Sequence, residues 1–181
     1  MPPADARAGS SRTTPRLLWM LAGVLLLLRV ATGVYEYRHA PQTVELVEWR
    51  PIEGAAEQAR LGGKPILYDF SAEWCGPCRA MAREVFADRK SAATINNLFV
   101  PVQVVDRVRE EGRNPPDVAA LQARYKVEAF PTLIVVDPTG GEPGRIEGYP
   151  GNSALIQELS RLGVEARIQR QLGGLKADST R

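Results

Sequence analysis

Two cysteines, Cys75 and Cys78, are the residues whose type and spacing most directly indicate chemistry in this sequence. They are the only cysteines of the chain, and Gly76 and Pro77 separate them. Two thiols at this spacing can close a disulfide and reopen it through thiolate attack. The alternative is a structural disulfide, but a bridge across two residues closes almost no loop and stabilises little. The pair therefore predicts a redox-active dithiol.

The two thiols are expected to have different roles. Cys75 is predicted to face solvent at a helix start, where unpaired backbone N–H groups and the helix dipole favour the nucleophilic thiolate. Cys78 lies one turn into the helix, where it would be shielded and would resolve the mixed disulfide. Gly76 and Pro77 carry no charge that could stabilise the thiolate, and this favours a reductant over an oxidant.

The elements that position this pair are predicted from apolar patterns. Residues 65–71 have the composition of a strand, and apolar residues from Cys78 to Phe86 mark one face of a helix. The pattern also predicts strands at 99–105, 132–136 and 145–149, and helices at 52–59, 92–98, 117–126 and from 152 onward, with an exposed loop at 107–116. This order predicts an α/β fold, a short mixed β-sheet with helices on both faces.

The segment from Asp69 to Cys78 (DFSAEWCGPC) resembles the active-site signature of the thioredoxin family, and Phe130-Pro131-Thr132 resembles its second signature. The likeness covers about residues 49–162 and implies a thioredoxin-like fold. Residues 84–106 are more similar to the membrane-anchored, extracytoplasmic, disulfide-reducing branch than to cytosolic thioredoxin.

The resemblance implies roles for further residues. Asp69 would be a buried carboxyl that exchanges a proton with Cys78, although a solvated position at the sheet end is the alternative. Pro131 would form a cis peptide bond facing the disulfide. Trp74 is expected either to contact substrate or to pack in the core. The expected substrate-binding set is Trp74, Gly76, Pro77, Phe130 and Pro131.

Two positions depart from the family pattern. Ser71 stands where many thioredoxins carry a Trp, and Val102 stands where they carry a Lys that pairs with the buried Asp. Loss of that Lys is expected to raise the pKa of Asp69.

The N-terminal region predicts a link to a membrane. Residues 1–16 form a basic lead without apolar periodicity, and residues 17–35 are apolar except for Arg29. The run can span a bilayer as an uncleaved transmembrane helix, which we favour, or it can serve as a signal peptide cleaved after Gly33. Both alternatives export the rest of the chain, because the arginine cluster stays on the cytoplasmic side. A linker at 36–48, a domain at 49–172 and a disordered tail at 173–181 complete the predicted organisation.

Composition argues against other classes of protein. The 23 basic and 21 acidic residues are mixed along the chain, so no nucleic-acid partner is expected. The single histidine, His39, lies in the predicted linker, so no metal site is expected, and no cofactor motif occurs.

The predicted function is that of a protein-disulfide reductase in the cytoplasmic membrane, single-pass, with its domain facing the periplasm or the cell exterior. It would act on thiols and disulfides of exported proteins, including those of cytochrome c maturation, and receive electrons from a membrane donor. The alternatives are a binding or chaperone-type module without turnover, a disulfide oxidase, and a secreted form.

Overall fold

The computed structural model describes residues 14–38, 44–137 and 144–178. The chain divides into two compact units, Met1–Gln42 and Thr43–Arg181. Most of the predicted basic lead, His39 and much of the linker, and the last tail residues lie outside the described residues.

The first unit contains a long helix, α1 (Thr14–Arg38). Its segment Leu18–Tyr35 has a mean hydropathy of 1.8, and none of that segment is buried. By length and composition this segment can cross a membrane. The apolar N-terminal helix predicted from the sequence is therefore present.

The second unit is built on one mixed sheet with the strand order β2-β1-β3-β4. The central strand β1 (Ile66–Ala72) pairs in parallel with β2 (Val100–Asp106) and antiparallel with β3 (Thr132–Val136). The edge strand β4 (Gly144–Glu147) pairs antiparallel with β3. The predicted mixed sheet and its thioredoxin-like arrangement are confirmed.

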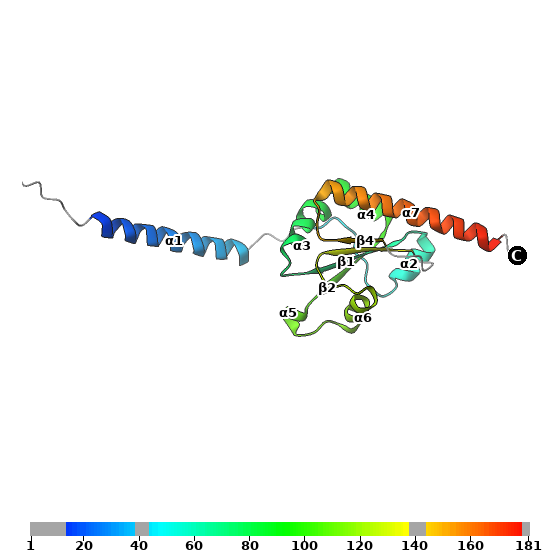
Figure 1. Ribbon diagram of the computed structural model, residues 1–181, viewed down its shortest axis with the longest axis horizontal. Coiled ribbons are helices and arrows are strands. Elements are labelled where there is room, and N and C mark those ends of the chain that lie inside the picture. Colours follow the sequence, from blue (N-terminus) through cyan, green and yellow to red (C-terminus); the bar gives the residue numbers. More distant parts are fainter. Residues whose placement is uncertain (1–13, 39–43, 138–143, 179–181) are drawn as a thin grey trace, which may run out of the picture. The chain divides into compact units, whose positions relative to one another are not determined.

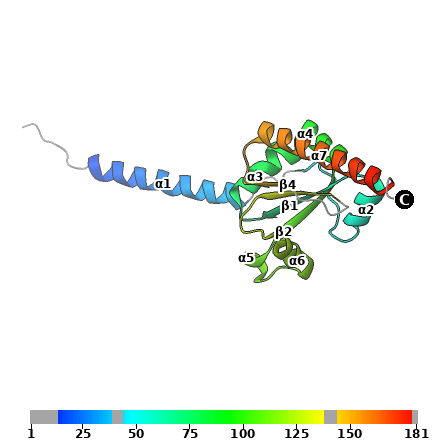
Figure 2. The same cartoon turned by 45° about the vertical axis from the view of Figure 1, so that its right-hand side comes forward.

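Helices cover both faces of this sheet, and Figures 1 and 2 show α4 and α7 on one side and α6 on the other. Because side chains alternate along a strand, Leu67 of β1 packs with Phe86 and Leu159 on one face, while Phe70 packs with Val118 on the other. The helices of this unit are α2 (Ala55–Gly62), α3 (Gly76–Met81), its π-helical continuation η1 (Ala82–Phe86), α4 (Arg89–Leu98), α5 (Val108–Glu111), α6 (Pro116–Tyr125) and α7 (Asn152–Asp178).

Several boundaries differ from the sequence-based ones. α4 begins at Arg89 rather than at residue 92, because the Asp88 carboxylate accepts the Ser91 N–H and caps the helix. The short helix α5 occupies part of the predicted loop. α7 continues through Gly173 to Asp178, so the predicted tail began too early. A glycine inside a helix lowers its stability by only about 1 kcal/mol relative to alanine and need not end the helix.

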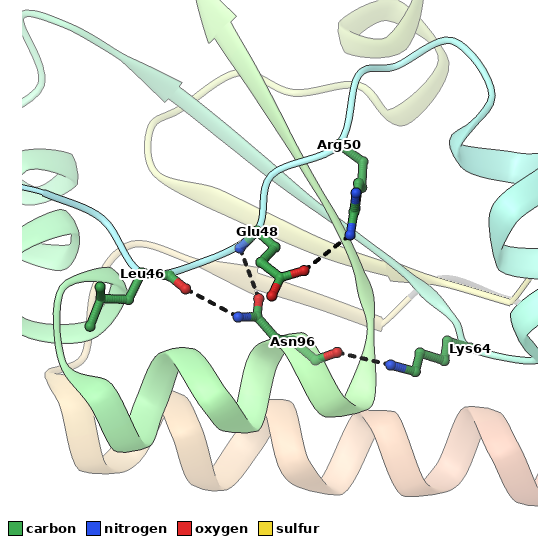
Figure 3. Close-up of polar contacts among 5 residues, drawn as sticks. All are labelled: Leu46, Glu48, Arg50, Lys64 and Asn96. Carbon is green, nitrogen blue, oxygen red and sulfur yellow. Dashed lines mark hydrogen bonds and ion pairs between the residues drawn. The ribbon is translucent and has the colours of Figure 1, made fainter.

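The segment before α2 packs against the domain, although the sequence assigned its first residues to the linker. Val47 is 6% exposed and belongs to the core. The Asn96 side chain accepts the Glu48 N–H at 2.9 Å and donates to the Leu46 carbonyl at 3.1 Å (Figure 3). The Arg50 N–H bonds to the Pro101 carbonyl at 2.8 Å. The second compact unit accordingly starts at Thr43.

Candidate active site

The two cysteines form a disulfide at the turn between β1 and α3, with a sulfur–sulfur distance of 2.06 Å. Cys75 is the N-cap of α3, and its sulfur accepts the backbone N–H of Cys78 at 3.2 Å. Pro77 suits the first turn of the helix because its missing N–H would have no partner inside the helix there. The turn thus places a backbone donor on the Cys75 sulfur, where it would also stabilise a thiolate.

The predicted difference in exposure between the two cysteines is not found in this oxidised state. Cys75 is 3% exposed and Cys78 is 6% exposed. Both pack with Ala72 and with the partly buried Phe130. The two sulfurs differ instead in their surroundings, since Cys75 receives the backbone donor and Cys78 lines a pocket that opens to solvent.

Asp69 lies inside the domain rather than at a solvated sheet end. It is 1% exposed, and neither carboxylate oxygen has a hydrogen-bond partner of good geometry among the described residues. Burial, followed by the negative charge of Glu45, raises the pKa of Asp69 to about 7. Weaker polar contacts with Gln103 and Ser71 lower the pKa only in part. The rise matches the direction expected from the missing Lys.

Asp69 and Cys78 line the same pocket, which has a volume of about 300 Å³. Asp69 shares a strand face with Leu67, and Gln103 is its register partner on β2. Ala82 and Phe86, the two ends of η1, form another wall of the pocket. The pocket is large enough for several water molecules, which could carry a proton between the carboxyl and the sulfur.

Two aromatic residues lie close to the disulfide: Trp74 precedes Cys75 in the chain, and Phe130 packs against both cysteines. The Phe130–Pro131 peptide bond is cis, as the family resemblance implies. Trp74 is 39% exposed and meets the Phe130 ring edge-to-face, with ring centroids 6.0 Å apart. The Arg109 guanidinium lies 3.9 Å from the centroid of the Trp74 ring. Trp74 is therefore not a core residue, and part of its side chain remains exposed to solvent.

Sequence reasoning missed two residues of this region, Glu45 and Arg109. Glu45 lines the pocket from a segment that the sequence assigned to the linker. Arg109 belongs to α5, in a region predicted to be a loop. No local pattern marks either residue, because both reach the site through tertiary packing. Among the described residues, no group of three or more His, Cys, Asp or Glu side chains is placed to hold a metal ion.

Comparisons with known proteins agree with this geometry. The family model of the thioredoxin-like domain matches residues 52–163. A thioredoxin of Mycobacterium bovis is 37% identical over 101 residues, which cover 54% of this chain and 72% of that protein. The solution structure of a thioredoxin from Thermus thermophilus is 25% identical with a TM-score of 0.56, and it covers 66% of this chain and 89% of that chain.

A second group of relatives is larger. The thiol:disulfide interchange protein DsbD of Yersinia pestis is 25% identical over 162 residues, covering 85% of this chain but 26% of that protein. This chain likewise spans 18% of a bifunctional thioredoxin reductase/thioredoxin of Mycobacterium leprae.

Proposed function

Because this chain belongs to the thioredoxin-like domain family of disulfide oxidoreductases, we propose that it reduces disulfides of exported proteins by cycling Cys75 and Cys78 between dithiol and disulfide. The observation that carries the proposal is the closed Cys75–Cys78 bond beside a buried carboxyl, Asp69, in a shared pocket. A purely structural bridge would need no such carboxyl, and an unpartnered buried carboxyl is costly to keep.

The reaction begins on the reduced pair. The Cys75 thiolate attacks a substrate disulfide, bonds to one sulfur and releases the other as a thiolate. Cys78 then loses its proton to Asp69 and attacks the Cys75 sulfur, which expels the second substrate thiolate and restores the Cys75–Cys78 bond. Two electrons pass to the substrate, whose thiolates take protons from water. A carboxyl with a pKa of about 7 suits this exchange, because it can both accept and return a proton near neutral pH.

The direction of the reaction is proposed from the residues between the cysteines. Gly76 and Pro77 add no positive charge, and Arg79 is exposed and donates to the Glu73 carbonyl at 2.7 Å. The Cys75 thiolate therefore has the backbone N–H and the helix start to stabilise it but no adjacent positive charge, and this keeps the reduction potential low, since whatever stabilises the reduced form makes the disulfide more oxidising. Disulfides of exported proteins, including those formed by apocytochrome thiols awaiting haem, are the proposed substrates. A membrane dithiol donor would restore the reduced pair.

Equilibration with glutathione redox buffers tests this direction. We expect the protein to have a potential near that of thioredoxin, about −270 mV. Alkylation followed by mass measurement would give the fraction of reduced protein at each buffer ratio. A value near about −120 mV, typical of a strong oxidant, would replace the reductase proposal with an oxidase.

The location is proposed from α1 and from the basic residues that precede it. We expect Leu18–Tyr35 to anchor the chain, with the N-terminus in the cytoplasm and the thioredoxin-like domain outside the cytoplasmic membrane. Protease added to spheroplasts is expected to digest the domain. Full protection would contradict this topology, and a mature protein starting near Val34 would identify a cleaved signal peptide instead.

A further inference from the structure

A second carboxyl group, that of Glu45, lines the pocket shared by Asp69 and Cys78. Glu45 precedes the part of the chain that matches the family model, which begins at residue 52. Its position therefore lies outside the residues that match the family model.

The backbone around Glu45 is held by contacts that do not involve its side chain. The Leu46 N–H bonds to the Phe86 carbonyl at 2.7 Å, and Asn96 bonds to the backbone on both sides of Val47 (Figure 3). Val47 itself is buried in the core. A substitution of the Glu45 side chain should therefore leave the path of this segment intact.

The Glu45 side chain has one well-defined partner. The Trp49 indole N–H donates to its carboxylate at 2.5 Å, and the Trp49 ring meets Phe86 edge-to-face at 4.9 Å between centroids. An indole nitrogen can only donate, so it favours the ionised carboxylate as acceptor. The pKa of Glu45 is raised overall, because burial raises it by more than the hydrogen bond from Trp49 lowers it.

The two carboxyl groups differ in how strongly they bind a proton, and Asp69 binds it more strongly than Glu45. Asp69 is almost completely buried and has no hydrogen-bond partner of good geometry among the described residues, whereas Glu45 is half-exposed and has Trp49. Two negative charges in one pocket repel each other, so ionisation of Glu45 disfavours ionisation of Asp69.

Three other charged residues line the same pocket, and each has a partner. Arg107 lies 3.6 Å from the Glu73 carboxylate and 3.2 Å from that of Glu111, while Arg79 donates to the Glu73 carbonyl. All of these side chains are exposed or half-exposed, so solvent screens their charges more than it screens the buried Asp69.

We propose that Glu45 is a positioning residue for the dithiol centre: held by Trp49, its carboxylate keeps the proton of this pocket on Asp69, beside Cys78. The inference rests on the proposed function of the Cys75–Cys78 pair. In this proposal, a charge from outside the residues that match the family model acts on the buried carboxyl of the active site.

The proton is used when a dithiol donor reduces the centre. A donor thiolate bonds to the Cys75 sulfur, the Cys75–Cys78 bond breaks, and the electron pair leaves on Cys78, which takes the proton from Asp69. The second donor thiolate then displaces Cys75 and leaves as the donor disulfide, so that two electrons have entered the pair.

The test is a carbon-13 NMR titration of the Asp69 carboxyl in the oxidised full chain in detergent micelles, with the signal assigned by its loss in Asp69→Asn. In wild type the midpoint is expected near 7. Glu45→Gln removes the neighbouring charge and is expected to lower the midpoint by roughly 0.5 to 1 pH unit.

Two further variants separate charge from structure. Glu48→Gln is the matched control, because Glu48 is exposed, pairs with Arg50 and does not line this pocket, so the midpoint should not move. Glu45→Asp keeps the charge and should restore a midpoint near that of wild type, and it is also the comparison of choice if Glu45→Gln folds poorly. An Asp69 midpoint that is the same in Glu45→Gln and wild type, or that moves equally in Glu48→Gln, would refute the proposal.

The titration uses no substrate and no turnover. If wild type fails to reduce any disulfide but Glu45→Gln lowers the midpoint, the coupling stands and the proposed function fails. If turnover is normal and the midpoint does not move, the coupling fails alone.

Discussion

Replacement of Cys75 by serine is expected to slow the catalysed reduction of insulin by dithiothreitol by at least about a thousand-fold. Serine has nearly the same size as cysteine, but its hydroxyl is not ionised at neutral pH and cannot form a mixed disulfide. The Cys75 sulfur is the one that accepts a backbone N–H, and we expect it to be the attacking thiolate. The turbidity of reduced insulin provides the measurement.

Cys78→Ser provides the matched variant, because it removes the resolving thiol and leaves the first attack possible. We expect this variant to lose turnover as well but to accumulate a covalent adduct with the substrate through Cys75, visible on a non-reducing gel. Adduct formation by Cys75→Ser through Cys78 would reverse the two roles. The same Cys78→Ser variant, expressed in cells, would capture the physiological substrates.

Asp69→Asn is expected to alter the pH dependence of stability. The folded-state pKa of Asp69, about 7, lies above its ordinary value of 3.8, so the folded protein binds this proton more tightly than the unfolded chain. The resulting stabilisation is complete below about pH 4 and is lost as the pH rises toward and through 7. A difference of about three pKa units corresponds to about 4 kcal/mol in the free energy of unfolding.

The variant lacks this titration, so its stability relative to wild type should rise by about 4 kcal/mol between pH 4 and pH 8. Denaturant unfolding of the oxidised chain from Thr43 onward would measure it. Asp106→Asn is the control, because the pKa of Asp106 is shifted in the opposite direction. Burial raises this pKa, but hydrogen bonds, chiefly from Asn114 and Gln122, outweigh burial and lower the pKa below its ordinary value. The stability that a lowered carboxyl pKa supplies is gained mostly below about pH 4, so the difference between this control and wild type should stay nearly constant from pH 4 to pH 8. A flat difference between wild type and Asp69→Asn would show that Asp69 is not the buried acid described above.

The sequence predicted those parts of the site that local patterns encode. β1 and the following helix start are marked by an apolar run and the Cys-Gly-Pro-Cys spacing, so the positions of Asp69, Cys75 and Cys78 could be predicted within a strand–turn–helix unit. Pro131 could be assigned only through the family resemblance, because most X–Pro bonds are trans.

Other features depend on contacts between distant segments. Glu45 reaches the pocket because Asn96 and Phe86, about 40 to 50 residues further along the chain, hold the segment around it. The near-equal burial of the two cysteines likewise follows from packing with Ala72 and Phe130. The place of a cysteine at a helix start does not by itself decide whether its thiol is exposed. Exposure also depends on whether neighbouring segments cover the thiol.

Catalysed disulfide reduction by this protein is measured by the number of turnovers that the wild-type chain makes in the insulin assay. With dithiothreitol in excess as electron donor, each protein molecule is expected to reduce many insulin disulfides, and the rate should be proportional to the protein concentration. Adduct formation on Cys78→Ser would assign this activity to the Cys75–Cys78 centre. A wild-type protein that binds insulin but gives no rate above the dithiothreitol background would contradict the account and identify a binding module without turnover.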